Sequence, residues 1–274
     1  MLLFLLNSIC YAGQSATGKW YAKKGGQAHS FNISKALAAA VLFLLWVLLS
    51  GKGIHLQSAP LALLYGICLT ISMYTGFMAL SCGPMALTGI IAAMSLLIPL
   101  FWGIVFQHEH LTFLQSIGIC LLICAIFCIC FKKQAGFSGK WLFYSLMTML
   151  TNGLCSVIQT RHQSVYPGQY QADFMFYAMT AVFLLYMLRT LLSKNTGIRI
   201  CLLGTCSGIL NGLANFIILL LAAKQAASTL FPLISAGNVA VAWLTGILFF
   251  RERISKLQLL GLIFGIGGII LLRL

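Results

Sequence analysis

Uncharged polar side chains recur at matching positions in the two halves of this chain. Two triads share the helical spacing i, i+4 and i+7 and lie 145 positions apart: Asn7, Tyr11 and Gln14, then Asn152, Ser156 and Gln159. Other members of the set are Ser72 with Asn215 and Ser95 with Asn238, each pair 143 positions apart, and Asn211. Amides and hydroxyls donate and accept hydrogen bonds without ionising at neutral pH. We therefore expect them either to bind a small polar molecule or to join helices by hydrogen bonds.

Residues that could carry catalysis are scarce. The motifs His-Glu-x-x-His and Gly-x-Ser-x-Gly, which would indicate a zinc or serine hydrolase, do not occur. The segment His108-Glu109-His110 has metal-ligand residue types, but its counterpart Arg251-Glu252-Arg253 cannot bind a cation. Nearly all of the ten cysteines lie in apolar runs, where a thiol is a small hydrophobic group. We expect no enzymatic activity, no metal and no cofactor.

The three carboxylates fall where they would stabilise helix ends. Glu109 and Glu252 precede predicted helices, and Asp173 begins one. A negative charge there interacts favourably with the helix N-terminus. None of the three lies in the middle of a predicted membrane segment, so a proton carrier based on a buried carboxylate is disfavoured. His162 beside Arg161 is the titratable pair that could serve as a proton relay instead.

The composition indicates that the solvent of this protein is lipid. Hydrophobic residues make up 61% of the chain and charged residues 7%, and the mean hydropathy is +0.99. A water-soluble domain of this length would have too little polar surface to cover itself. The net charge of +14 would suggest nucleic-acid binding in a soluble protein. Here the Lys and Arg residues fall between apolar runs, so we expect no nucleic-acid partner.

Ten apolar segments have about the 20-residue length that a helix needs to span a bilayer. Gly, Pro and Lys residues mark the breaks between them. The predicted segments are 2–19, 31–49, 59–81, 84–106, 111–131, 140–161, 172–192, 198–222, 226–249 and 256–273. The predicted fold class is therefore an all-α integral membrane protein with ten transmembrane helices.

A second motif is shared by the two halves. Gly103 and Glu109 lie 143 positions before Gly246 and Glu252, and in both places the next helix opens with Gln-x-x-Gly. The repetition predicts two five-helix repeats, residues 1–134 and 135–274. Because each repeat has an odd number of helices, the second is expected to be inverted in the membrane relative to the first. Many secondary transporters are built in this way, with the substrate site between the repeats.

Glycine and proline positions add two expectations. Gly89 and Pro232 are 143 positions apart, about one and a half turns inside their predicted helices, where a helix break could expose backbone groups to a bound molecule. Pro99 could kink the predicted helix 84–106 a second time. A kink without a ligand is the alternative. Near the C-terminus, Gly261, Gly265 and Gly268 form a small-residue face that favours close helix packing or a homodimer contact.

The basic residues predict an orientation, because Lys and Arg are enriched in cytoplasmic loops. Thirteen of the 17 lie in or beside the loops after predicted helices 1, 5, 7 and 9: Lys19, Lys23, Lys24, Lys35, Lys132, Lys133, Lys140, Arg189, Lys194, Arg199, Arg251, Arg253 and Lys256. The other four are Lys52, Arg161, Lys224 and Arg273. Both termini are therefore predicted to lie outside the cytoplasm. Lys19, Arg161 and Lys224, at helix ends, could also attract an anionic substrate.

The chain resembles the drug/metabolite transporter superfamily, and within it the ten-helix EamA-type branch. The resemblance covers essentially the whole chain and is strongest from Gly103 to Glu109 and from Gly246 to Glu252, each with the following Gln-x-x-Gly. It implies two inverted five-helix repeats, a central cavity and transport by alternating access. It also implies cytoplasmic termini, the opposite of the orientation that the charges predict.

The resulting hypothesis is a multi-pass permease of the bacterial cytoplasmic membrane. It would export a small organic metabolite, such as an amino acid or a similar amphipathic compound, by alternating access. Alternatives are a multidrug or nucleotide-sugar-like exchanger of the same fold, a membrane-embedded enzyme, and a structural membrane subunit. The expected partners are the small-molecule substrate and the lipid bilayer.

Overall fold

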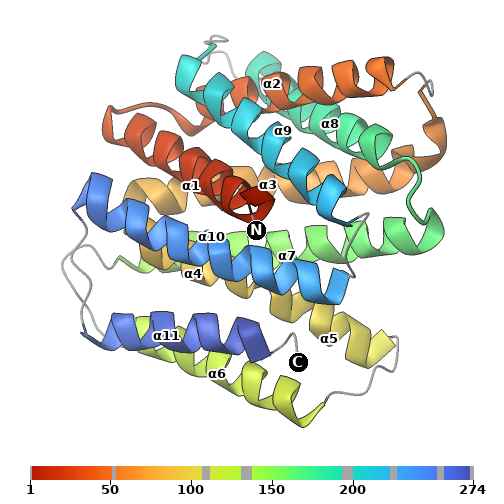
Figure 1. The fold of residues 1–274 in the computed structure, drawn as a ribbon. Coiled ribbons are helices and arrows are strands. Elements are labelled where there is room, and N and C mark those ends of the chain that lie inside the picture. The colour runs from red at the N-terminus through yellow and green to blue at the C-terminus, as the bar shows by residue number, and fades with distance from the viewer. Residues whose placement is uncertain are drawn as a thin grey trace.

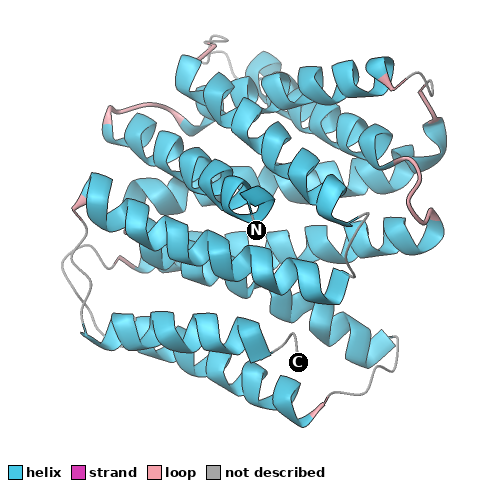
Figure 2. Cartoon of the chain, in the orientation of Figure 1, coloured by secondary structure: helices cyan, strands magenta, loops and turns pink. Residues whose placement is uncertain are grey.

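The computed structural model describes residues 2–50, 54–106, 112–130, 138–192, 200–222, 227–251 and 256–271. These residues form helices joined by short connections, and they contain no β-strand (Figure 2). The helices are α1 (Leu2–Lys23), α2 (Ala28–Leu49), η1 (Leu56–Ser58), α3 (Ala59–Cys82), α4 (Met85–Ala93), η2 (Met94–Leu96), α5 (Leu97–Phe106), α6 (Phe113–Cys130), α7 (Gly139–Val165), α8 (Gln171–Leu192), α9 (Leu202–Ala222), α10 (Ala227–Phe250) and α11 (Lys256–Leu271). Each predicted segment coincides with one helix to within a few residues, with a single exception.

The exception is the predicted segment 84–106, which is divided into α4, η2 and α5. Pro99 has no backbone N–H to donate to the carbonyl of Ser95, four residues earlier, which explains why the α-helical pattern is interrupted there. Gly89 lies inside α4 and Pro232 inside α10, and both helices continue through these positions. The predicted helix breaks at Gly89 and Pro232 are therefore not found.

Helices from the two halves of the chain pack side by side throughout the bundle (Figure 1). α1 lies against α9 and α10, and α7 lies against α3, α4 and α5. α8 packs on both α2 and α3, α2 also packs on α9, and α10 packs on α4. α6 and α11 pair with each other at one edge of the bundle.

Glycines permit the closest helix contacts. A Cβ added at Gly208 of α9 would collide with the backbone carbonyl of Lys35 on α2. A Cβ added at Gly268 of α11 would lie 2.8 Å from the carbonyl oxygen of Gly118 on α6. The C-terminal glycine face thus serves close packing within the chain at Gly268, and the homodimer contact stays a prediction.

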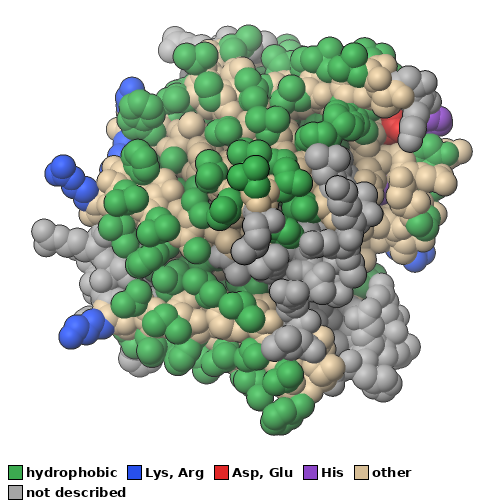
Figure 3. Space-filling model, in the orientation of Figure 1, with side chains coloured by type: hydrophobic (Ala, Val, Ile, Leu, Met, Phe, Trp, Pro, Cys, Tyr) green, Lys and Arg blue, Asp and Glu red, His purple; other side chains and the backbone are tan. Residues whose placement is uncertain are grey.

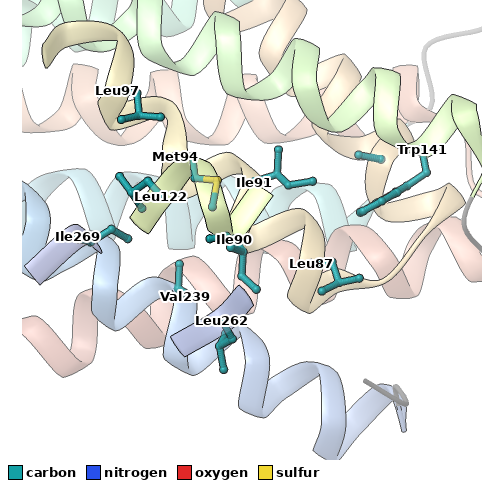
Figure 4. Close-up of a cluster of buried hydrophobic side chains, with 12 residues drawn as sticks. Leu87, Ile90, Ile91, Met94, Leu97, Leu122, Trp141, Val239, Leu262 and Ile269 are labelled. Atoms are coloured by element: carbon teal, nitrogen blue, oxygen red, sulfur yellow. The ribbon is translucent and has the colours of Figure 1, made fainter. Parts of the chain in front are cut away.

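Buried apolar side chains connect α4 to the pair formed by α6 and α11 (Figure 4). They are Leu87, Ile90, Ile91 and Met94 of the α4–η2 segment, Leu122 of α6, Val239 of α10, and Leu262 and Ile269 of α11. Trp141 of α7 is fully buried in the same cluster, and its indole Nε1 donates a hydrogen bond of 2.9 Å to Thr88 Oγ1 of α4. α4, which forms one wall of the site described below, is therefore held from both sides.

Four stretches of the described chain are long and apolar enough to cross a membrane. They are Ala28–Leu49, Leu56–Cys82, Gly139–Val165 and Gln171–Leu192. The visible surface of the bundle is rich in apolar side chains (Figure 3), and Leu49 and Leu191, for example, are 85% and 75% exposed. Such a surface suits contact with lipid better than contact with water.

Candidate binding cavity

A cavity of about 360 Å³ lies between the two halves of the chain, which is within the size range of small-molecule sites. Residues of α1, α2, α3, α4 and η2 line it from the first half, and residues of α7, α8, α9 and α10 line it from the second. Amides and hydroxyls alternate on its wall with apolar side chains such as Met73, Phe77 and Met179. The cavity can therefore hold a molecule with both polar and apolar parts.

Ten of the eleven polar residues singled out in the sequence line this cavity. They are Tyr11, Gln14, Ser72, Ser95, Asn152, Ser156, Gln159, Asn211, Asn215 and Asn238. Gly89 lines it as well, although it does not break its helix. Pro232 is placed only as part of α10. Tertiary packing thus brings together polar groups from six helical segments that are far apart in the sequence.

Asn7, the eleventh residue, is not part of the cavity wall. Its side chain is fully buried, and its Nδ2 donates a hydrogen bond of 2.8 Å to the carbonyl oxygen of Ala214 on α9. Asn7 therefore joins two helices and, unlike the other ten residues, does not line the cavity.

Some cavity residues hydrogen-bond to each other across the two halves. Ser72 Oγ on α3 donates to Asn152 Oδ1 on α7 at 2.5 Å. Asn211 Nδ2 on α9 donates to Gln14 Oε1 on α1 at 2.9 Å. Lining the cavity and joining helices are therefore combined in the same side chains, although the sequence presented them as alternatives.

Two amide groups of the wall retain an atom without a hydrogen-bond partner. Gln14 Nε2 and Asn238 Oδ1 are both buried, and neither is paired within the described part of the chain. Leaving such an atom unpaired costs about 1–3 kcal/mol. A bound polar molecule could accept from Gln14 and donate to Asn238, which would remove that cost.

Sequence reasoning missed Asn32 and Lys35, which line the cavity from α2. Lys35 was counted among the basic residues that set orientation, but it lies about two turns inside α2. Asn32, one turn earlier, is buried and donates from Nδ2 to the Tyr186 hydroxyl at 3.0 Å. The sequence could have indicated both residues, because each is a polar residue within an apolar run, like the cavity residues that were predicted.

Three aromatic side chains pack against one another at the cavity wall. The ring centroids of Tyr21 and Phe31 are 5.7 Å apart, and those of Phe31 and Phe77 are 5.2 Å apart. Phe31 and Phe77 both line the cavity. Beside them, Lys19 Nζ donates to the Gly83 carbonyl at 3.0 Å and ties the end of α1 to the turn before α4.

The titratable residues considered in the sequence lie elsewhere. Asp173 is in the first turn of α8, as predicted, with Oδ2 3.6 Å from His55 Nδ1. His162 is buried against the ring of Phe174, at 4.4 Å between centroids, and is not part of the cavity wall. The predictions for Glu109, Glu252 and the two flanking histidines of Glu109 fall on residues outside the described ranges.

Comparison with known proteins identifies the fold but not the activity. No protein-family model matches the chain. An uncharacterized protein of Haemophilus influenzae is 25% identical over 193 residues, and the match covers 64% of this chain and 62% of that protein, less than two thirds of its length. A protein of known crystal structure has a TM-score of 0.67 at 14% identity, with 98% of this chain and 94% of the other covered. At that identity the similarity shows a common fold alone.

Proposed function

We propose that this protein is a permease of the bacterial cytoplasmic membrane that exports a small organic metabolite by alternating access. The observation that carries the proposal is the cavity of about 360 Å³ on which ten of the predicted polar residues converge from both halves. Polar side chains inside a bilayer are costly unless they face such a cavity or each other. We also propose that the chain is an EamA-type member of the drug/metabolite transporter superfamily, with ten membrane spans in two inverted repeats, residues 1–134 and 135–274.

The packing of the helices supports the inverted repeats. Let α1, α2, α3, α4–α5 and α6 correspond in order to α7, α8, α9, α10 and α11. Under this correspondence, the α3–α7 contact is equivalent to the α9–α1 contact, and both are present. The α2–α9 contact is likewise equivalent to the α8–α3 contact, and both are present. The contacts of α2 with α8, α4 with α10 and α6 with α11 join equivalent helices. A pseudo-twofold axis between two repeats predicts this exchange.

Alternating access requires that one end of the cavity open while the other closes. The packed rings of Tyr21, Phe31 and Phe77 would form the closed end in the present conformation. Rocking of one half against the other would separate them. Recognition by neutral amides such as Asn152 and Asn238 suits a transporter, because the substrate must bind in one state and leave in the other.

Charge supports an orientation. Most basic side chains of the described residues gather where α1, α8 and α10 end and α7 and α11 begin (Figures 1 and 3). The exceptions are Arg161, at the end of α7, and Lys35, about two turns inside α2. By the positive-inside rule this end is cytoplasmic, so both termini lie outside. In intact cells, a cysteine replacing exposed Lys24 should react only with a membrane-permeant reagent. Reaction with an impermeant reagent would reverse the orientation, as the superfamily resemblance implies.

Transport itself is tested with purified protein in lipid vesicles. A thermal-shift screen against metabolites and drugs supplies candidate substrates, and each is then assayed by counterflow of the labelled compound, with protein-free vesicles as the control. We expect saturable uptake that depends on unlabelled compound inside. A compound that stabilises the protein and is chemically altered without being moved would instead support a membrane-embedded enzyme.

A further inference from the structure

A lysine that the sequence pattern did not assign to the cavity, Lys35, is among the residues that line it. We propose that the substrate is an amphipathic organic anion, with one carboxylate or phosphate group joined to an apolar group, and that Lys35 pairs with the anionic group. The inference rests on the proposed function and names its substrate class.

Lys35 is the one charged side chain among the described residues that line the cavity. Within that part of the chain its ammonium group has no hydrogen bond and no ion pair, and the described carboxylate, Asp173, contacts His55 instead. A charged group removed from water is strongly favoured by a counter-ion of opposite sign. With its ammonium group directed into the cavity, Lys35 would supply an unpaired positive charge that an anionic substrate would complement.

Other residues of the same cavity wall fit the two parts of such a molecule. Gln14 Nε2, buried and unpaired, is a second donor that an anionic oxygen could accept from. Phe31, Phe77 and Met73 line the same cavity and offer an apolar surface. A simple inorganic ion would not contact the apolar surface, and an uncharged hydrocarbon would not accept hydrogen bonds from the donors.

A lysine side chain can also extend along apolar surface until its charge reaches the membrane interface. In that arrangement Lys35 would contribute to orientation and leave the cavity electrically neutral. The two arrangements differ in the electrostatic potential inside the cavity, which can be measured before any substrate is known.

The potential is measured at Ser156→Cys, on the cavity wall, in a variant whose native cysteines are replaced. Labelling rates are compared for an anionic and a cationic methanethiosulfonate reagent of similar size. We expect the anion-to-cation rate ratio to fall at least about tenfold in Lys35→Met and to be retained in Lys35→Arg. Lys140→Met, which removes a basic residue of the same end of the bundle outside the cavity wall, is the matched control and should leave the ratio unchanged.

The outcomes separate this inference from the proposed function. An unchanged ratio in Lys35→Met, or no anion preference in the parent, overturns the anion site while leaving a permease intact. Failure of even a small neutral thiol reagent to reach Ser156→Cys means that the cavity is not accessible, which overturns the proposed function and the anion site together.

A second measurement uses the native cysteines, so it does not depend on the cysteine-free variant folding. Thermal stabilisation of the wild-type protein is compared for phenylacetate, its uncharged match phenylacetamide, and phenyl phosphate at millimolar concentration. We expect at least one anion to stabilise more than the amide, and this difference to disappear in Lys35→Met and remain in Lys35→Arg. Equal shifts for acid and amide, or no shift with either anion, would overturn the proposal.

Discussion

Two asparagines at equivalent sequence positions, Asn7 and Asn152, make different contacts in the structure. Asn7 on α1 and Asn152 on α7 hold the same position in their triads. Asn7 is buried and donates to the Ala214 carbonyl of α9, whereas Asn152 lines the cavity and accepts from Ser72 of α3. The same residue in the same place of a repeated pattern therefore only joins helices in one half, whereas in the other it both joins helices and lines the cavity.

The partner helices explain the difference. Ser72 and Asn215 occupy equivalent positions on α3 and α9. The Ser72 hydroxyl has a side-chain acceptor on the neighbouring helix, but Asn215 donates at 2.9 Å to the carbonyl of Asn211 in its own helix. Asn7 Oδ1, the counterpart of Asn152 Oδ1, consequently has no partner among the described residues, and Asn7 Nδ2 donates to the backbone of α9 one residue away, at Ala214. A hydrogen bond within one helix thus changes which hydrogen-bond partners are available to the facing helix.

The largest effect is expected from separating the helices that form these contacts. Gly208→Ala would place a Cβ against the Lys35 carbonyl, push α9 away from α2, and shift Asn211 relative to Gln14. We expect destabilisation of about 3 kcal/mol, visible as a loss of folded yield and a lower unfolding temperature. Gly139→Ala, where an added Cβ meets nothing within 4 Å, is the control. A Gly208→Ala protein as stable as wild type would contradict the close α2–α9 packing.

The next largest effect concerns transport. Asn152→Ala removes a cavity amide, and we expect the transport rate per folded molecule to fall about tenfold or more, equivalent to about 1.4 kcal/mol. Gln159→Ala and Asn238→Ala should behave alike, because both side chains line the cavity. Counterflow in vesicles and fluorescence-detected size exclusion give the two readouts. Parallel losses of yield and transport would mean that these amides are structural.

Asn7→Ala tests whether Asn7, unlike Asn152, contributes to stability alone. Loss of its hydrogen bond to Ala214 should lower stability by about 1 kcal/mol, the usual size for a polar contact between membrane helices. Transport per folded molecule should stay within about twofold of wild type. The unfolding temperature and the counterflow rate check both parts. A loss of transport without a loss of stability would instead indicate that Asn7 contacts the substrate.

The smallest effect is expected at Ser156. Its hydroxyl donates to the Asn152 carbonyl of the same helix at 3.1 Å, so it is already satisfied locally. Ser156→Ala should change stability by less than about 0.5 kcal/mol and transport by less than about twofold. Melting curves and counterflow on the same preparation test this. A tenfold loss of transport would place the hydroxyl in direct contact with the substrate.

Most of the helical architecture could be predicted because helix length and composition are local properties. An apolar run bounded by Gly, Pro or Lys is enough to locate helices such as α2 and α8 to within a few residues. The break predicted at Gly89, from its symmetry with Pro232, is not found. The kink predicted at Pro99 agrees with the interruption at Met94–Leu96, because a proline leaves the carbonyl four residues before it without a helical donor.

The sequence by itself determined that polar groups recur on helical faces, and ten of the eleven chosen residues do line one cavity. Only the tertiary structure decided that Asn7 turns to a neighbouring backbone and that Lys35 joins the cavity wall. The physical reason is that spacing along a helix defines a face, but not what that face meets. The close approach of Gly208 to the backbone of Lys35, between residues far apart in the chain, fixes how α2 lies against α9.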